Sequence, residues 1–314
     1  MRADRSALLA LLETSVMYSI TIISRAKVNL TLEVLGRRAD GYHDLDSVAR
    51  IIDLTDELSI AKADEGVIEI GSDTQGVPSG PDNLVHKACR AFFVATGIRA
   101  GARCNLVKRI PARAGLGGGS GNAAAAIAAL NDLYECGLPV DRLAEIAGRV
   151  GSDVGLFVYG GTVRMRGRGE RVEALPDAPE MHLVVVKPEV GVSTAWAYRE
   201  LDRSPGRSQR GASDAAERAV RAGDRAGLIA SMWNDFDPMV AAAFDEIASA
   251  KRSLLDHGAQ AALLAGSGSA VFGVFATKEA AESVADSIRR EFGNVLVTRT
   301  LPRRQPVSSP GGED

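Results

Sequence analysis

The sequence predicts an α+β fold with two lobes that meet near residues 170–180. Strand-like and helix-like segments follow one another without the strict strand–helix alternation of a parallel α/β sheet. The chain has 314 residues, of which 46% are hydrophobic and 25% are charged. It is therefore long and apolar enough to bury a core in each lobe.

The N-terminal half contains most of the strand signals. Apolar side chains that alternate, or that run together between turn residues, predict strands over residues 19–35, 47–54, 57–61, 67–70, 104–110, 154–159 and 162–165. Helices are predicted over residues 82–96, 122–136 and 140–150. Gly137 and Pro139 end the second of these helices, and Gly151 ends the third.

The C-terminal half mixes strands and helices in the same way. Strands are predicted over residues 181–187, 261–264, 270–275 and 294–300, and helices over residues 193–201, 214–231, 238–257 and 278–292. The expected organisation is a loosely ordered extension over 1–17, an N-terminal lobe over 18–175, a C-terminal lobe over 176–301 and a disordered tail over 302–314.

Charge and cysteine content narrow the classes of partner. A net charge of −3 gives no electrostatic reason to expect binding to nucleic acid or to an acidic membrane surface. No apolar run reaches the roughly 18 residues of a membrane helix. Cys89, Cys104 and Cys136 are scattered without Cys-x-x-Cys spacing, which fits a reducing compartment. We expect a cytoplasmic protein that acts on a small molecule as a monomer or a weak homodimer.

A glycine-rich loop that opens onto an alanine-rich helix is the strongest functional signal. Glycines let backbone N–H groups approach a phosphate, and the first turn of a helix adds unpaired donors and the positive end of its dipole. The loop is therefore predicted to bind nucleotide phosphates. The predicted binding residues are Pro111, Ala112, Arg113, Ala114, Gly115, Leu116, Gly117, Gly118, Gly119, Ser120, Gly121 and Asn122.

Three well-known nucleotide-binding loops do not match this one. A P-loop needs a lysine after its second glycine, and no lysine occurs between Lys108 and Lys187. The dinucleotide fingerprint needs a glycine where Ser120 or Asn122 stands. The strand lysine motif and the catalytic triplets of protein kinases are missing. A phosphate loop of another family and a turn needed only for packing both remain open.

Four further segments place polar or aromatic residues where chemistry could occur. Each one alone also fits a structural role, such as an exposed strand face or a tight turn. They are Lys27 and Asn29 on one face of a strand, Tyr42 and His43 in a turn, Asp153 at a bend, and Gly266 and Ser267 in a second small-residue turn.

Together these segments resemble the GHMP kinases, the family of galactokinase, homoserine kinase and mevalonate kinase. That family has a lysine-bearing N-terminal strand, a Pro-x-x-x-Gly-Leu-Gly-Ser-Ser-Ala-Ala-like loop and a C-terminal glycine turn, and the chain is similar in the same order. The resemblance implies an N-terminal lobe like ribosomal protein S5 and a ferredoxin-like C-terminal lobe. It also implies ATP as phosphate donor with Mg²⁺, and Ser120 as the residue that contacts the metal or a phosphate.

The resemblance assigns the catalytic step to Lys27 and Asp153, which would converge on the acceptor hydroxyl. The Asp-Gly-Tyr-His turn at residues 40–43 is similar to that of a member acting on a cytidine diphosphate-linked methylerythritol. Tyr42 and Tyr198 would stack on the cytosine, and His43 would read its edge. The residues expected to bind this substrate are Asn29, Tyr42, His43, Thr194, Tyr198, Gly266 and Ser267.

Two alternatives stay open beside this reading. One is another GHMP kinase that acts on a small alcohol of the homoserine or mevalonate type. The other is a non-catalytic nucleotide-binding relative, supported by two departures from the family pattern. Gly121 stands where relatives commonly have a second loop serine, and Gly155 stands where proline commonly follows Asp-Val.

Overall fold

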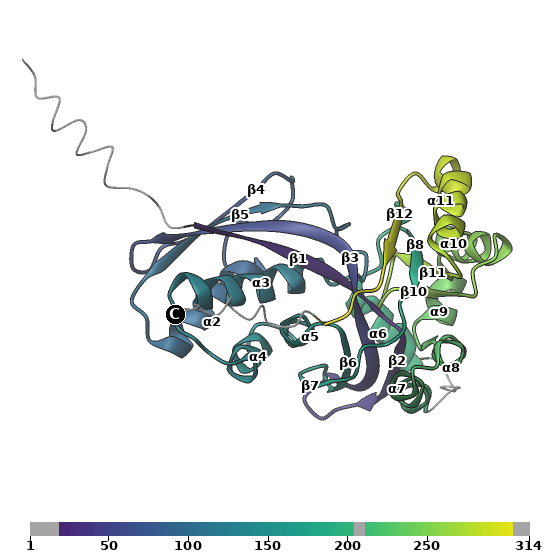
Figure 1. Ribbon diagram of the computed structural model, residues 1–314, viewed down its shortest axis with the longest axis horizontal. Coiled ribbons are helices and arrows are strands. Elements are labelled where there is room, and N and C mark those ends of the chain that lie inside the picture. The colour runs from purple at the N-terminus through teal and green to yellow at the C-terminus, as the bar shows by residue number, and fades with distance from the viewer. Residues whose placement is uncertain (1–18, 204–210, 304–314) are drawn as a thin grey trace, which may run out of the picture.

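A computed structural model describes residues 19–203 and 211–303 of the chain. The predicted extension over 1–17 and residues 304–314 of the predicted tail lie outside these ranges. In the described residues an eight-stranded sheet and a four-stranded sheet form the centres of two lobes that lie side by side (Figure 1). The predicted α+β fold of two lobes is thereby confirmed.

The large sheet is built around β3 (His43–Ala63), which pairs antiparallel with β1 (Ser19–Asn29) and with three other strands. The sequence predicted two separate strands here, and that prediction was wrong, because polar residues such as Asp53 and Asp56 interrupt the apolar pattern within one 21-residue strand. The remaining strands are β2 (Thr31–Arg37), β4 (Ile68–Ser72), β5 (Gly101–Val107), β6 (Thr162–Gly167), β7 (Arg171–Ala174) and β9 (Trp233–Asn234).

Four helices cover one face of the large sheet (Figure 1): α2 (Leu84–Thr96), α3 (Gly118–Leu133), α4 (Val140–Gly148) and α5 (Val154–Tyr159). The first turns of α3 carry the alanines 123–126, all of them buried. Small side chains let the helix backbone lie close to the strands, where it packs on Leu58, Ile60 and Leu106. This packing fixes the glycine loop at the start of α3 against the sheet.

The strand predicted over residues 154–159 is helix α5 instead, so this prediction was wrong. A run of six mostly apolar residues between turn signals has no period that separates a short buried strand from a short buried helix. The structure buries the first turn, Val154 to Leu156, and ends the helix at Gly160, whose φ is 65°. The bend that carries Asp153 is therefore a helix start.

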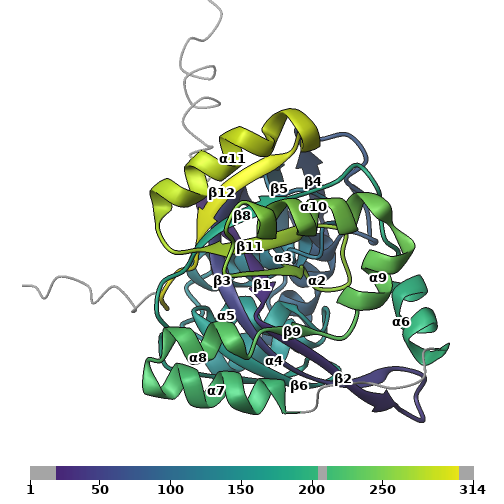
Figure 2. The same cartoon turned by 90° about the vertical axis from the view of Figure 1, so that its right-hand side faces the viewer.

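The small sheet has the antiparallel order β10 (Ala261–Leu264), β11 (Val271–Phe275), β8 (His182–Val186) and β12 (Val295–Arg299). Successive residues of β8 face opposite sides: Leu183 and Val185 pack toward the N-terminal lobe, and Val184 and Val186 pack under the outer helices. Figure 2 shows those helices, α10 (Asp245–Asp256) and α11 (Lys278–Phe292), over this sheet. Burial on both faces explains the unbroken apolar run of β8.

Each of two long helices predicted in the C-terminal half is a pair of shorter ones. Gly223, at φ 65°, ends α7 (Ala212–Ala222) before α8 (Arg225–Ala230). Phe244 is extended and separates α9 (Asp237–Ala243) from α10. Helix α6 (Thr194–Arg203) precedes these four helices and borders the cleft described below.

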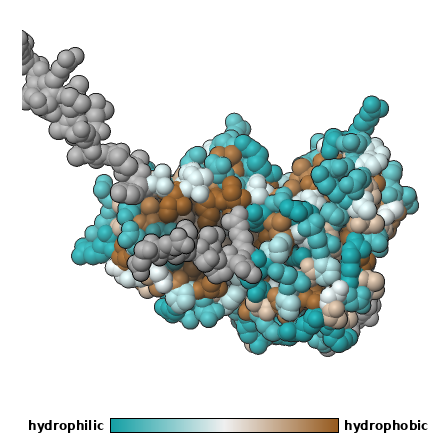
Figure 3. Space-filling view, viewed as in Figure 1, coloured by the Kyte–Doolittle hydropathy of each residue, from teal (hydrophilic) through white to brown (hydrophobic). Residues whose placement is uncertain are grey.

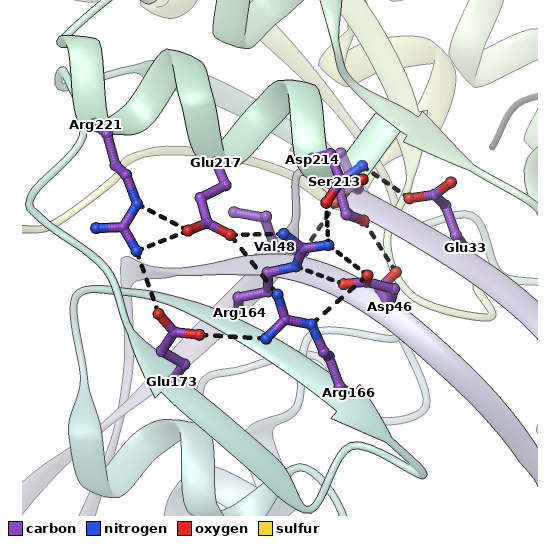
Figure 4. A network of polar contacts seen from close by, with 11 residues as sticks. Glu33, Asp46, Val48, Arg164, Arg166, Glu173, Ser213, Asp214, Glu217 and Arg221 are labelled. Atoms are coloured by element: carbon purple, nitrogen blue, oxygen red, sulfur yellow. Dashed lines mark hydrogen bonds and ion pairs between the residues drawn. The ribbon is translucent and has the colours of Figure 1, made fainter. Parts of the chain in front are cut away.

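A network of ion pairs and hydrogen bonds holds helix α7 against the large sheet (Figure 4). Arg164 of β6 is 6% exposed and binds Asp46 of β3 through two nitrogens, while it also donates to Asp214 and Glu217 of α7 at 2.6 Å. The carboxylate of Glu33 accepts the backbone N–H of Ser213 at 2.8 Å. The first residues of α7 are thus held by side chains of β2, β3 and β6.

One face of the molecule carries an apolar patch along β1 (Figure 3), where a groove is lined by Ile22, Ile23, Phe157 and Leu301 among others. In the ranges 19–203 and 211–303 no helix has both the length and the apolar character needed to cross a bilayer.

Candidate active site

The glycine loop and the C-terminal glycine turn lie against each other. Ala114 accepts a hydrogen bond from the backbone N–H of Ala270 at 3.2 Å. A Cβ at Gly115 would lie 1.8 Å from the carbonyl oxygen of Ala265, so only glycine fits at this contact. Lys27 of β1 joins them through its backbone N–H, which donates to Leu116 at 2.9 Å. Three segments from distant parts of the sequence therefore meet at one point.

The side chains of Lys27 and Asp153 form an ion pair at this point, with Nζ 3.6 Å from Oδ2. The lysine side chain is 4% exposed and the aspartate side chain is 41% exposed, so the ammonium is buried while the carboxylate is open to solvent. The methylene stem of Lys27 lies against Gly117, where a Cβ would come within 3.0 Å of Cγ. The glycine at 117 thus makes room for the lysine.

A chain of three hydrogen bonds orients the ammonium group of Lys27. Its Nζ donates to Oδ1 of Asn29 at 2.6 Å, and Nδ2 of Asn29 donates to the hydroxyl of Ser47 at 2.8 Å. Ser47 in turn donates to the carbonyl of Thr31 at 2.5 Å. Nothing in the sequence singles out Ser47, because its partners lie on two other strand segments.

A cleft of about 960 Å³ extends from this point. Its volume suits a small-molecule substrate. Every residue that the sequence predicted to be catalytic or substrate-binding lines it: Lys27, Asn29, Tyr42, His43, Asp153, Thr194, Tyr198, Gly266 and Ser267. Of the predicted nucleotide loop, Gly115 and Gly117 line the same cleft.

Aromatic side chains line one part of the cleft. The ring of His43 stacks on Tyr198 with centroids 4.7 Å apart, and Phe236 meets the tyrosine edge-on at 4.9 Å. Burial raises the pKa of Tyr198 to about 12, so its hydroxyl stays protonated and can donate. Tyr42 is 58% exposed, with the guanidinium of Arg168 over its ring at 4.8 Å. The cytosine sandwich between Tyr42 and Tyr198 stays a prediction.

On the nucleotide side, the structure gives Asn122 a supporting position. Both N–H groups of its amide are used, one on Ser24 and one on Asp56 at 3.0 Å each, and its oxygen accepts from Lys108 at 2.8 Å. Asp56 also forms an ion pair with Lys108 and accepts the backbone N–H of Ile110. The Asn122 side chain is thus used within the protein, and the donors left at this loop are the backbone N–H groups in the first turn of α3, which have no intrahelical acceptor.

The two departures from the family pattern have structural explanations. A Cβ at Gly121 would lie 2.4 Å from the carbonyl oxygen of Arg25, so the close approach of α3 to β1 requires glycine there. Gly155 lies in the first turn of α5, and a Cβ on it would meet Val172 at an ordinary 3.4 Å. Gly155 is therefore part of the helix that starts at Asp153.

Restoring the family serine at position 121 is expected to harm this protein. Gly121→Ser should lower the free energy of unfolding by about 1–3 kcal/mol, because the new Cβ forces the helix away from β1. Thermal unfolding measures the effect. Gly119→Ser is the matched control, since its Cβ would have only Leu84 nearby, at 3.5 Å. A Gly121→Ser enzyme that is both as stable as the parent and faster would contradict this account.

Within residues 19–203 and 211–303 no three histidine, cysteine, aspartate or glutamate side chains gather to hold an ion. Ser120 lies partly buried in the first turn of α3, beside the backbone donors of the loop.

Comparison with known families matches both lobes. Residues 83–161 match the model for the GHMP kinases N terminal domain, and residues 215–294 match the model for the GHMP kinases C terminal domain. A 4-diphosphocytidyl-2-C-methyl-D-erythritol kinase of Pelotomaculum thermopropionicum is 44% identical over 91% of this chain and 99% of its own. The chain belongs to the GHMP kinase family. It is thus an ATP-dependent small-molecule kinase.

Further GHMP kinases agree in sequence and in fold. A relative of the same name from Moorella thermoacetica is 43% identical over 90% of this chain and 99% of its own. The crystal structure of a 4-(cytidine 5'-diphospho)-2C-methyl-D-erythritol kinase superposes with a TM-score of 0.74 at 31% identity, covering 90% of this chain and 99% of that one. A homoserine kinase from Cytophaga hutchinsonii shares the fold at a TM-score of 0.75 and 21% identity, covering 93% and 97%.

Proposed function

We propose that this kinase transfers the γ-phosphoryl group of ATP to the 2-hydroxyl of 4-diphosphocytidyl-2-C-methyl-D-erythritol. The products are ADP and the 2-phosphate, and the reaction is a step of the non-mevalonate, or methylerythritol phosphate, route to isoprenoid precursors. One observation carries the proposal. The Lys27–Asp153 pair and two glycines of the loop line the same cleft as Tyr42, His43 and Tyr198.

The catalytic pair works mainly by position and charge. The oxygen of the substrate hydroxyl attacks the γ-phosphorus, the bond from phosphorus to the bridging oxygen of ADP breaks, and the hydroxyl proton passes to the carboxylate of Asp153. Because the transition state is loose, the proton moves late, and a weakly basic carboxylate is sufficient to orient the hydroxyl. The ammonium of Lys27, 3.6 Å from this carboxylate, offsets the negative charge on the transferring group.

The residues of the loop also fit Mg²⁺ that arrives with ATP. In kinases this ion keeps most of its coordination to phosphates and water, with one or two protein oxygens. The Ser120 hydroxyl, beside the backbone donors of α3, is the candidate protein ligand. When bound, Mg²⁺ neutralises charge on the phosphates.

The compartment and oligomeric state are part of the same proposal. Cys89, Cys104 and Cys136 are free thiols, and the first two have sulfurs 3.8 Å apart without a disulfide. Free thiols support the reducing cytoplasm as the compartment. A monomer or weak homodimer stays a prediction.

The substrate assignment is tested by turnover. The purified enzyme should phosphorylate the cytidyl substrate with a kcat/KM at least about 10³-fold above that for homoserine or mevalonate, since neither alcohol fills the aromatic part of the cleft. Preference for either small alcohol would replace the proposed function with the first alternative. A chain that binds ATP but turns over none of these substrates would be the non-catalytic relative.

Removing the exposed ring of Tyr42 should weaken binding of the cytidyl substrate without weakening binding of ATP. Tyr42→Ala should raise the KM for the cytidyl substrate about tenfold, because one stacking face for the base is lost. The KM for ATP should change less than twofold, because the ring of Tyr42 packs with Arg168 and is assigned to the base of the other substrate. Steady-state kinetics with each substrate varied measures both values. An equal rise in both KM values would show that the variant disturbs the fold and not the base site.

A further inference from the structure

Of the five residues of helix α6 that line the cleft, three lie at intervals of four: Thr194, Tyr198 and Asp202. Residues at this spacing share one face of a helix. The hydroxyl of Thr194 lies 2.9 Å from that of Ser267, and Tyr198 stacks on His43. Asp202 continues the row in the last turn of the helix and also reaches His43, which implies a role in the same site.

The contact of Asp202 with His43 is a hydrogen bond at the edge of the imidazole. Oδ1 of Asp202 lies 2.8 Å from Nε2 of His43, although the residues are 159 positions apart in sequence. The histidine is buried, and the side chain of Asp202 is 28% exposed. The ring is held on one face by Tyr198 and at one edge by Asp202, so its orientation in the cleft is fixed.

This hydrogen bond also determines which nitrogen carries the proton. A carboxylate only accepts, so Nε2 must be the donor, and in the neutral ring Nδ1 is then left as an acceptor. Cytosine presents an exocyclic amino donor on its pairing edge, whereas uracil presents a carbonyl oxygen there. An acceptor nitrogen attracts the amino group of cytosine and is repelled by the carbonyl of uracil.

We propose that Asp202 is a positioning residue that holds His43 in the Nε2–H tautomer and thereby makes the enzyme prefer cytidyl over uridyl substrates. The inference rests on the proposed function, since it takes the base of the acceptor substrate to be the group that His43 reads. Without the carboxylate, the proton can occupy either ring nitrogen and the ring can turn about its side-chain bonds. The donor form of Nδ1 then accommodates uracil.

The test compares two acceptor substrates on the parent enzyme and on Asp202→Ala. The ratio of kcat/KM for the cytidine diphosphate-linked substrate to that for its uridine counterpart should fall about 10- to 100-fold in the variant. The KM for ATP should stay within about twofold. Glu200→Ala is the matched control on the same helix, because its carboxylate pairs with Arg203 outside this row. The control should keep the parent ratio.

A second measurement needs no variant. The ¹⁵N NMR spectrum of histidine-labelled parent enzyme should show His43 as the Nε2–H tautomer. The Nδ1–H form, or an unchanged substrate ratio in a folded Asp202→Ala enzyme, would overturn the role of Asp202 and leave the proposed function standing. Failure of the parent enzyme to phosphorylate the cytidyl substrate would instead remove the proposed function itself.

Discussion

Lys27→Met is expected to lower kcat by about 10³-fold, and Asp153→Asn by a similar factor, with ATP affinity kept within a few-fold. Methionine retains the stem that packs on Gly117 while removing the charge, so the fold should survive. The buried ammonium of Lys27 lies 3.6 Å from the carboxylate, and in the proposed mechanism it offsets the charge that develops during transfer. A loss of this size corresponds to about 4 kcal/mol of transition-state stabilisation.

The double variant gives a sharper test than either single one. Because the two side chains act as a unit, Lys27→Met combined with Asp153→Asn should be little slower than the worse single variant. Lys87→Ala, an exposed lysine on α2, is the control and should keep full activity. Rapid-quench measurement of a single turnover separates the chemical step from product release. Full turnover in both single variants would reject this pair as the catalytic centre.

The site residues that could be predicted are those whose type and local spacing carry chemistry. A glycine run before an alanine-rich helix signals anion binding by itself, and Lys27 and Asp153 became candidates through the family pattern that accompanies it. The residues that support them could not be predicted. Asp56 reaches Asn122 across 66 positions and Asp202 reaches His43 across 159. Such partners are set by tertiary contacts, which leave no trace in a local pattern.

The same limit explains the errors in the fold. Polar residues interrupt the apolar pattern within β3 because they contact different partners along this long strand. A prediction from the local pattern therefore divides the strand in two. The six residues of α5 are too few for the helical period to show. By contrast β8 was predicted because a strand buried on both faces is apolar at every position. Local pattern therefore gave the two-lobe architecture but missed details that depend on neighbours distant in sequence.

Replacing Arg164 is expected to be the most destabilising change outside the catalytic centre. Arg164→Leu should lower the free energy of unfolding by about 3–5 kcal/mol, because the buried guanidinium is the common partner of three carboxylates (Figure 4). Without it, the mostly buried carboxylates of Asp46 and Glu217, 14% and 17% exposed, repel each other. Helix α7 should then detach from β3 and β6. Chemical denaturation measures the loss, with midpoint and slope read separately.

The pH dependence of the stability lost in Arg164→Leu shows whether the ion pairs cause that loss. Hydrogen bonds from Arg164, and then from Arg221, lower the pKa of Glu217. A carboxyl whose pKa is lowered by folding stabilises the native state above its unfolded pKa of about 4.3, and this contribution disappears as pH falls through the folded value. Leucine removes the main cause of the shift. The stability difference between parent and variant should therefore be largest near pH 7 and shrink below about pH 4.

A matched control distinguishes the network from a general loss of charge. Arg103→Leu removes an arginine of β5 that lies outside this network, where its 45% exposed side chain pairs with Glu69, and it should cost less than about 1 kcal/mol. If Arg164→Leu is equally mild, or if its effect does not change between pH 7 and pH 4, the buried ion pairs do not hold α7. In that case apolar contacts of α7, such as those of Ala216 and Val220 in the core shared with Val48, are sufficient to hold the helix.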